Sequence, residues 1–339
     1  MKRLMAMLLA AAMACSMTAC SSSDGQKSTA EGENGEMVVR VGDFLGETFL
    51  YPVKIANAKG FFEEEFGKDN ITISIEYLGS GAVMTEALTA GELEMSFLGG
   101  QPAFSGISNG NGVKIISMAT SSSTDPCLLV AADSDITDVS QLKGKNLAVN
   151  IGTDNHYQLV EMLALGGLTE GDINLYNLKG AEAYAALTSG EIDCMQSIAP
   201  NTYQFVANGD ARILATMDQT EGRNNQVLVV SPDFAEEHGD IIVRFLKVLQ
   251  RAEDYYKENP DECKDILVEY VGDNVDRELM DEYMDKYDCS LHLNAEDKAY
   301  LERQYNFLYE HDMLSGPVDL ETIYDDSFLI EAFGTTEAH

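Results

Sequence analysis

The sequence predicts an α/β protein with two similar lobes that are joined by a hinge and face each other across a cleft. The main observation is an internal repeat, in which residues 87–94 (ALTAGELE) return as residues 186–193 (ALTSGEID). A proline follows each copy, at Pro102 and Pro200. The roughly 300 residues that follow a polar N-terminal stretch are enough for two lobes with separate cores.

Each copy of the repeat is typical of a helix end, a glycine turn and then a short buried strand. A further strand and helix precede each copy. The preceding segments are residues 38–41 and 53–62 in the first half, and residues 147–151 and 157–165 in the second. Two α/β units with the same order of elements would form a cleft at the carboxyl ends of their strands, where ligands bind in such folds.

The N-terminus has the layout of a secretory signal. Lys2 and Arg3 precede an apolar stretch at residues 4–13, which is too short to span a bilayer. The segment from Met17 to Cys20 (MTAC) resembles a bacterial lipobox, which implies a signal peptide at residues 1–19 and acylation of Cys20. The alternative is an ordinary cleaved signal with an incidental cysteine.

Residues 20–36 follow as a polar stretch rich in Ser, Gly and Glu, and we expect a flexible tether there. The apolar runs at residues 127–131 and 226–230 are candidate hinge strands. They divide the chain into one lobe of residues 37–125 plus 230–339 and a second lobe of residues 126–229. The last hundred residues are predicted to be mainly helical, with an interruption at Pro260, and to complete the first lobe.

The composition is strongly acidic, with 57 Asp and Glu against 22 Lys and Arg and a formal net charge of −35. Nucleic acid is excluded as a partner because phosphate binding requires clustered basic residues. The charge favours a soluble monomer. An anionic ligand would have to be held by local dipoles rather than by net charge.

Neither the cysteines nor any sequence motif indicates a metal site or an enzymatic activity. The four cysteines beyond residue 20 are too widely spaced for a metal motif, and we expect buried thiols rather than disulfides. They are Cys127, Cys194, Cys263 and Cys289. The sequence contains no H-E-x-x-H zinc motif and no G-x-x-x-x-G-K-[ST] phosphate loop. We therefore expect no enzymatic activity, no metal and no cofactor.

Several short motifs together resemble one family along nearly the whole mature chain. They are VRVG at 39–42, KGFFEE at 59–64, GELE at 91–94, GQPA at 100–103, LKGK at 142–145, GTDNHY at 152–157, FLY at 307–309 and YDDSF at 324–328. In this order they are similar to the proteins that bind aliphatic sulfonates, taurine and nitrate for ABC importers. The resemblance implies a type II periplasmic-binding-protein fold, a small-molecule ligand, a permease and its ATPase as partners, and an extracytoplasmic, lipid-anchored location.

The turn at residues 152–156 is the main candidate for an anion site. It joins a predicted strand to a predicted helix, and the N–H groups at a helix N-terminus bind oxyanions without Lys or Arg. Thr153, Asn155 and His156 would hold the anionic group; the resemblance implies the Thr and His roles. The alternative is that Thr153 or Asp154 caps the helix and that His156 packs against the hinge.

The remaining candidates lie on other segments expected to face the cleft. Gln101 and Asn201 follow pseudo-equivalent strands and would orient the ligand. Phe44 and Thr48 follow the first strand, where relatives contact the organic part of the ligand, although core packing competes for Phe44. Ser121 could offer a hydroxyl, or belong to an ordinary solvated loop.

Three functions remain open from the sequence. The first is the solute-binding component of an ABC importer for an aliphatic sulfonate or a taurine-like solute. For a taurine-like solute, Asp125 is a candidate partner of the amine. The second is the same role for nitrate or a heteroaromatic vitamin precursor, since one scaffold accepts different solutes by changing a few side chains. The third is a surface adhesin or sensor lipoprotein without transport.

Overall fold

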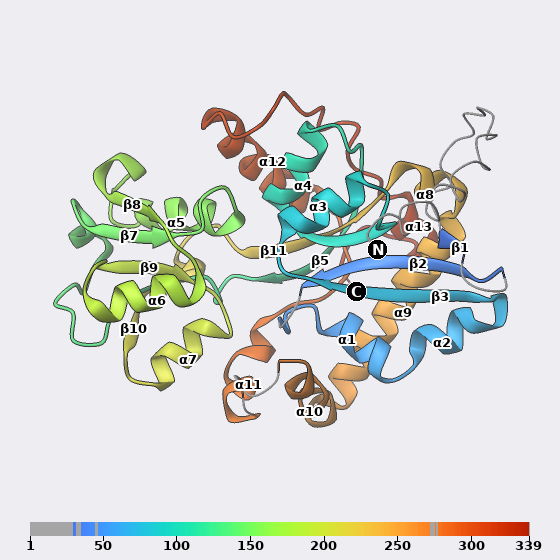
Figure 1. Cartoon of the computed structure of the whole chain (residues 1–339), viewed down its shortest axis with the longest axis horizontal. Coiled ribbons are helices and arrows are strands. Elements are labelled where there is room, and N and C mark those ends of the chain that lie inside the picture. Colours follow the sequence, from blue (N-terminus) through green and yellow to red (C-terminus); the bar gives the residue numbers. More distant parts are fainter. Residues whose placement is uncertain (1–29, 32–34, 45–46, 272–274, 276, 339) are drawn as a thin grey trace, which may run out of the picture.

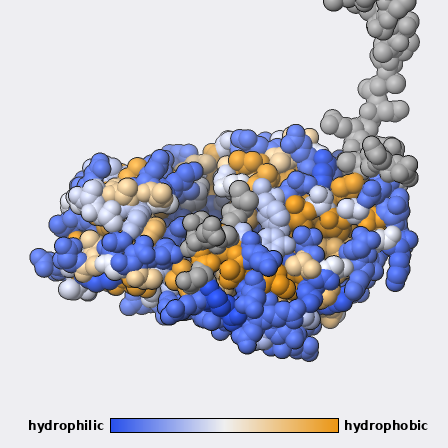
Figure 2. Space-filling model, turned by 60° about the horizontal axis from the view of Figure 1, so that its bottom comes forward, coloured by the Kyte–Doolittle hydropathy of each residue, from blue (hydrophilic) through white to orange (hydrophobic). Residues whose placement is uncertain are grey.

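The computed structural model describes residues 30–31, 35–44, 47–271, 275 and 277–338. The expected signal peptide (1–19), Cys20 and most of the tether (20–36) lie outside the described residues. Figure 1 shows two α/β lobes side by side, as the repeat predicts. The surface in Figure 2 is mostly hydrophilic, in agreement with the acidic composition.

Lobe 1 is built on a six-stranded sheet with the order β1-β2-β4-β11-β5, and β3 pairs with β2. Its strands are β1 (Ala30–Glu31), β2 (Met37–Phe44), β3 (Ile71–Leu78), β4 (Met95–Gly99), β5 (Lys114–Ser122) and β11 (Asn224–Val230). Strand β2 runs parallel to β3 and β4, whereas β11 runs antiparallel to β4 and β5.

Helices cover both faces of this sheet, with α3, α4 and α12 on one side and α1 and α2 on the other (Figure 1). The helices of lobe 1 are α1 (Tyr51–Ala58), α2 (Phe61–Phe66), α3 (Gly81–Thr89), α4 (Gly100–Ser108), α8 (Pro232–Glu237), α9 (Gly239–Glu258), α10 (Pro260–Val271), α11 (Arg277–Tyr283), α12 (Ala295–Glu310) and α13 (Ser327–Phe333). The C-terminal region is mainly helical as expected, and the break between α9 and α10 falls at Asn259, next to Pro260.

Lobe 2 repeats the plan on a smaller scale, with a five-stranded sheet in the order β10-β6-β9-β7-β8. Its strands are β6 (Cys127–Ala131), β7 (Asn146–Val149), β8 (Asn174–Asn177), β9 (Cys194–Ser197) and β10 (Ala211–Thr216), and its helices are α5 (Asp154–Ala164), α6 (Gly180–Ser189) and α7 (Asn201–Ala207).

The repeated sequence forms the same structure in both lobes. Gly91 and Gly190 each follow a helix with positive φ, at 70° and 77°, a conformation that glycine adopts without a steric penalty. The acidic residue that closes each copy then binds the neighbouring parallel strand. Glu94 accepts the N–H of Arg40 at 2.6 Å, and Asp193 accepts the N–H of Asn146 at 2.9 Å. These carboxylates set the register between each repeat strand and its parallel neighbour.

The expected hinge boundary must be corrected on one side. The run at residues 226–230 belongs to β11, which pairs with β5 over residues 224–230 and with β4 over residues 226–230, so it is a strand of lobe 1. The chain therefore returns to lobe 1 between Thr216 and Asn224, not at residue 229. An apolar strand can pair with either sheet, so its composition could not assign it to a lobe.

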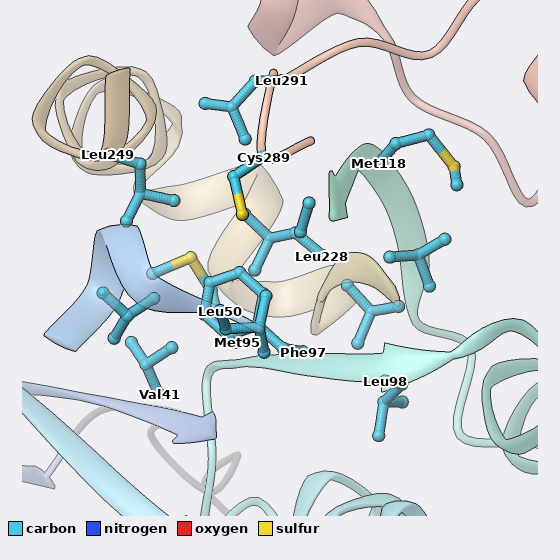
Figure 3. Close-up of a cluster of buried hydrophobic side chains, with 14 of the residues drawn as sticks. Val41, Leu50, Met95, Phe97, Leu98, Met118, Leu228, Leu249, Cys289 and Leu291 are labelled. Carbon is cyan, nitrogen blue, oxygen red and sulfur yellow. The ribbon is translucent and has the colours of Figure 1, made fainter. Parts of the chain in front are cut away.

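The core of lobe 1 joins side chains from β2, β4, β11 and α9, including Val41, Met95, Leu228 and Leu249 (Figure 3). Cys289 packs in the same cluster. All four cysteines of the described chain are buried free thiols, which confirms the expectation of thiols rather than disulfides.

Within the described ranges, none of the helices is at once long enough and apolar enough to cross a membrane.

Replacing Glu94 with Ala is expected to lower the free energy of unfolding by about 1–3 kcal/mol, because the N–H of Arg40 and its guanidinium lose a buried acceptor. Asp193→Ala should cost less, about 1 kcal/mol, since the Asp193 side chain is 32% exposed whereas that of Glu94 is fully buried. Urea unfolding measures both. The exposed Glu92→Ala serves as the control, and a Glu94→Ala loss no larger than its loss would contradict this role.

Candidate ligand-binding site

A cleft of about 550 Å³ lies between the lobes and is lined by residues of both. Lobe 1 contributes the segments that follow β2 and β3, one side of α4 with Asn109 at its C-terminal end, and the start of β11. Lobe 2 contributes residues 150–155 between β7 and α5, Lys179 at the start of α6, and Ile198 after β9. The position at the ends of strands agrees with the place where ligands bind in open α/β sheets.

The lobe 2 wall is a turn held by its own hydrogen bonds. The Thr153 hydroxyl donates to the carbonyl oxygen of Asn150 at 2.7 Å, and Gly152 adopts a φ of 79°. The N–H of Ile151 donates to Oδ1 of Asn177 at 3.1 Å. Helix α5 begins directly afterwards, so its first-turn N–H groups and the positive end of its dipole border the cleft.

Three of the expected site residues line this cleft: Phe44, Thr153 and Asn155. Four others, Thr48, Gln101, Ser121 and Asn201, do not. The Thr48 hydroxyl is buried against the hydroxyl of Tyr283 at 3.1 Å. The side-chain amide of Gln101 is buried, with no hydrogen-bond partner in the described part of the chain. Ser121 lies in β5, where its N–H bonds to Asp288, and Asn201 is an exposed residue at the start of α7.

His156 is buried in lobe 2 and does not line the cleft. Its Nδ1 accepts the N–H of Gly152 at 3.5 Å, its ring meets Phe307 edge-on at 5.2 Å, and its Nε2 lies 3.4 Å from Glu170. Burial lowers the pKa of His156. This placement fits the alternative in which His156 is a packing residue rather than a ligand-binding one. It packs against helix α12 and not, as that alternative expected, against the hinge.

Asp154 connects the lobes. Its Oδ1 accepts the N–H of Gln101 at 3.2 Å and the side-chain amide of Gln304 at 3.1 Å, so a lobe 2 carboxylate lies on the N-terminus of α4 in lobe 1. Burial raises the pKa of Asp154 to about 6, against the hydrogen bonds it accepts. A Cβ atom at Gly99 would overlap Oδ2 of Asp154, so the glycine permits this approach.

Asp125 also connects the lobes, at the hinge between β5 and β6. Its Oδ1 accepts the N–H of Ala199 at 2.7 Å, and its Oδ2 lies 3.5 Å from the amide nitrogen of Asn224. Burial raises the pKa of Asp125 to about 6. The carboxylate thus joins the chain segment that enters lobe 2 to the start of β11, where the chain returns to lobe 1, and to the end of β9.

Sequence reasoning missed Glu47 and Lys179, which both line the cleft. Burial, with the nearby Asp125, raises the pKa of Glu47 to about 8, and its Oε2 is buried without a hydrogen-bond partner among the residues that the structure describes. Glu47 lies between Phe44 and Thr48, which the sequence predicts as site residues. Its position in the same segment, directly after the first strand, could have indicated that it lines the cleft. For Lys179, no motif in the sequence marks the residue.

One segment has the spacing of a serine nucleophile motif, G-x-S-x-G, at residues 106–110. It lies at the C-terminal end of α4, not at a turn from a strand into a helix. The Ser108 hydroxyl donates to the carbonyl oxygen of Gly316 and accepts its N–H, at 2.8 and 2.9 Å. Ser108 therefore fastens a loop and has neither the position nor the free hydroxyl of a nucleophile.

Asp154→Ala is expected to shift the unliganded protein toward a more open arrangement of its lobes. The substitution leaves the N–H of Gln101 and the amide of Gln304 without this acceptor, at a cost of about 1–3 kcal/mol to the closed arrangement. Small-angle X-ray scattering should record a larger radius of gyration. Asp172→Asn is the control because its bonds to Thr169 and Lys143 stay within lobe 2; equal radii for the two variants would argue against an Asp154 bridge.

Comparisons of sequence agree on one family. The family model described as NMT1/THI5 like matches residues 23–263. A Bacillus subtilis (strain 168) protein named for binding aliphatic sulfonates is 28% identical over 284 residues, which cover 84% of this chain and 85% of that protein. The taurine-binding periplasmic protein of Escherichia coli (strain K12) is 28% identical over 218 residues, or 63% of this chain and 66% of its own length.

Comparisons of structure agree on the fold. The periplasmic aliphatic sulphonate binding protein SsuA of Escherichia coli matches with a TM-score of 0.77 and 21% identity, covering 84% of this chain and 91% of its own. The desulfurization enzyme DSZB shares the fold at a TM-score of 0.66 and 15% identity, over 88% of this chain and 99% of its own. Because the family model covers well over half of the sequence, the chain belongs to the NMT1/THI5-like family.

Proposed function

We propose that this chain is the extracytoplasmic solute-binding component of an ABC importer and that it binds a small organic oxyanion, an aliphatic sulfonate or a taurine-like solute, between its lobes. The observation that carries the proposal is the N-terminus of α5 at the wall of an interlobe cleft. Such a helix end binds an oxyanion through N–H groups and its dipole, which suits a protein with a strong net negative charge. The names of the two sequence relatives agree with this ligand class.

The mechanism is closure of the two lobes around the hinge. The ligand contacts both lobes, so it stabilises the closed arrangement more than the open one, and the closed surface then docks on a permease. In this proposal, Thr153, Asn155 and the first N–H groups of α5 hold the oxyanion, and Phe44 contacts the organic part. His156 acts through its bond to Gly152, which shapes the turn.

A panel of solutes tests the proposal directly. The soluble chain from residue 21 onward would be heated with ethanesulfonate, taurine, nitrate, a pyrimidine and a flavin. A solute at a hundred times its Kd stabilises the fold by about 2.7 kcal/mol, which raises the melting temperature measurably. A shift with sulfonates supports the proposal. A shift with nitrate or the heteroaromatic solutes alone would contradict this ligand class, and no shift at all would favour an adhesin or sensor without transport.

Lys179→Met is expected to weaken sulfonate binding about tenfold, because a hydrogen bond to a charged group contributes about 1.5–3 kcal/mol. Lys179 is a cation of the lobe 2 wall. Isothermal titration calorimetry measures the change. Lys143→Met, which removes a 70% exposed lysine paired with Asp172, is the matched control. If both variants bind like the parent protein, Lys179 takes no part in holding the anion.

The location follows from the N-terminal motif. We propose that Cys20 is lipid-modified and holds the chain at the outer face of the cell membrane, with residues 20–36 as the tether. Cys20→Ser is expected to move the protein from the membrane fraction to the soluble fraction of the producing bacterium, since no acyl chain can then be attached. Immunoblots of the two fractions measure this. A variant that stays with the membrane would rule out this anchor.

A further inference from the structure

We propose that the solute carries a protonated amine as well as its oxyanion, and that Glu47 is the specificity-determining residue that receives the amine. The inference rests on the function proposed above and narrows its substrate to an aliphatic aminosulfonate of the taurine type. It starts from a hydrogen-bond acceptor: Glu47 lines the cleft, and its Oε2 is buried with no hydrogen-bond donor in the described part of the chain. A buried carboxylate oxygen in this state is costly unless a ligand supplies a donor.

Among the described residues, the cations near Glu47 already have other partners. Lys54 is buried and already pairs with Asp43 at 2.6 Å. The other charged or titratable neighbours of Glu47 are Asp43, Asp125 at the hinge, Tyr283 in α11 and Tyr287 after it, none of which is a cation. Lys286, which acts on Asp125, donates to the hydroxyl of Tyr203 at 2.6 Å. Burial and the charge of Asp125 together raise the pKa of Glu47 to about 8. Without ligand, Glu47 is therefore mostly protonated at pH 7.

The charges of the cleft have a polarity that fits a zwitterion. The lobe 2 wall offers the α5 N-terminus and Lys179, and its carboxyl, that of Asp154, is already engaged by Gln101 and Gln304. The lobe 1 wall offers Glu47 and the exposed Glu86. A solute that contacts both lobes meets a site for an anion at one end and an acceptor at the other. A simple alkanesulfonate would leave Oε2 of Glu47 unsatisfied, whereas an ammonium group would supply both a donor and a countercharge.

Two aromatic rings reinforce this end of the cleft. Phe44 and Phe49 both line it on either side of Glu47 in the sequence, and their ring centroids lie 5.5 Å apart. A cation close to such rings is attracted by their electron-rich faces. The same rings offer apolar contact to a short alkyl chain. The combination suits an ammonium group on a short carbon chain.

The test compares solutes that share a sulfonate and differ only at the other end. Isothermal titration calorimetry at pH 7 would use taurine, isethionate with a hydroxyl in place of the amine, and ethanesulfonate with a methyl group. Taurine is expected to bind at least about tenfold more tightly than either. Because an ammonium ion lowers the pKa of Glu47, taurine should also release about one proton per molecule bound, and isethionate should release none. Titrations in two buffers of different ionisation enthalpy measure this release.

Glu47→Gln keeps the size of the side chain and removes its charge. It should bring the affinity for taurine down to that for ethanesulfonate and abolish the proton release, with a melting curve to verify that the variant is folded. Glu92→Gln, an exposed change in the same lobe, should keep the preference for taurine. Equal binding of all three sulfonates by the parent protein would overturn the inference and leave the proposed function standing. Failure of all three to bind would overturn both.

Discussion

The contact of Asp154 with the N-terminus of α4 is the interaction on which the site depends. It brings the N-terminus of α5 in lobe 2 against the N-terminus of α4 in lobe 1, and it explains why glycine is required at residue 99. Tyr157 and His156 of α5 pack against Tyr300 and Phe307 of α12, so the contact is supported by an apolar surface. The cleft exists in its present form because this face of lobe 2 is docked on lobe 1.

Buried charge is concentrated beside the cleft. Burial raises the pKa of the carboxyls of Asp43, Glu47, Asp125 and Asp154, so each is less acidic than in water. Three of them have donors within the protein, which are Lys54, the N–H of Ala199 and the N–H of Gln101. Glu47 differs because its Oε2 has no donor among the described residues. The three aspartates therefore stabilise the fold, whereas the carboxyl of Glu47 is available to a solute.

Much of the fold could be predicted from the sequence because the repeat encodes local structure. In each lobe a glycine with positive φ is followed three positions later by an acidic residue that binds the neighbouring strand, so similarity of sequence implied similarity of structure. The sequence could not predict whether β11 belongs to lobe 1 or lobe 2, because strand pairing depends on contacts between residues that are far apart in the sequence. Thr153 and Asn155 were found because a helix start after a strand is a local signal. The burial of His156 depends on α12, about 150 residues later, which no local pattern could indicate.

The central claim is that the N-terminus of α5 receives an oxyanion while the lobes are closed around it. A crystal structure of the protein with taurine tests it most directly. The account predicts sulfonate oxygens within hydrogen-bonding distance of the backbone N–H groups at the start of α5, with the amine toward lobe 1. A sulfonate bound elsewhere, with these N–H groups facing only water, would contradict it.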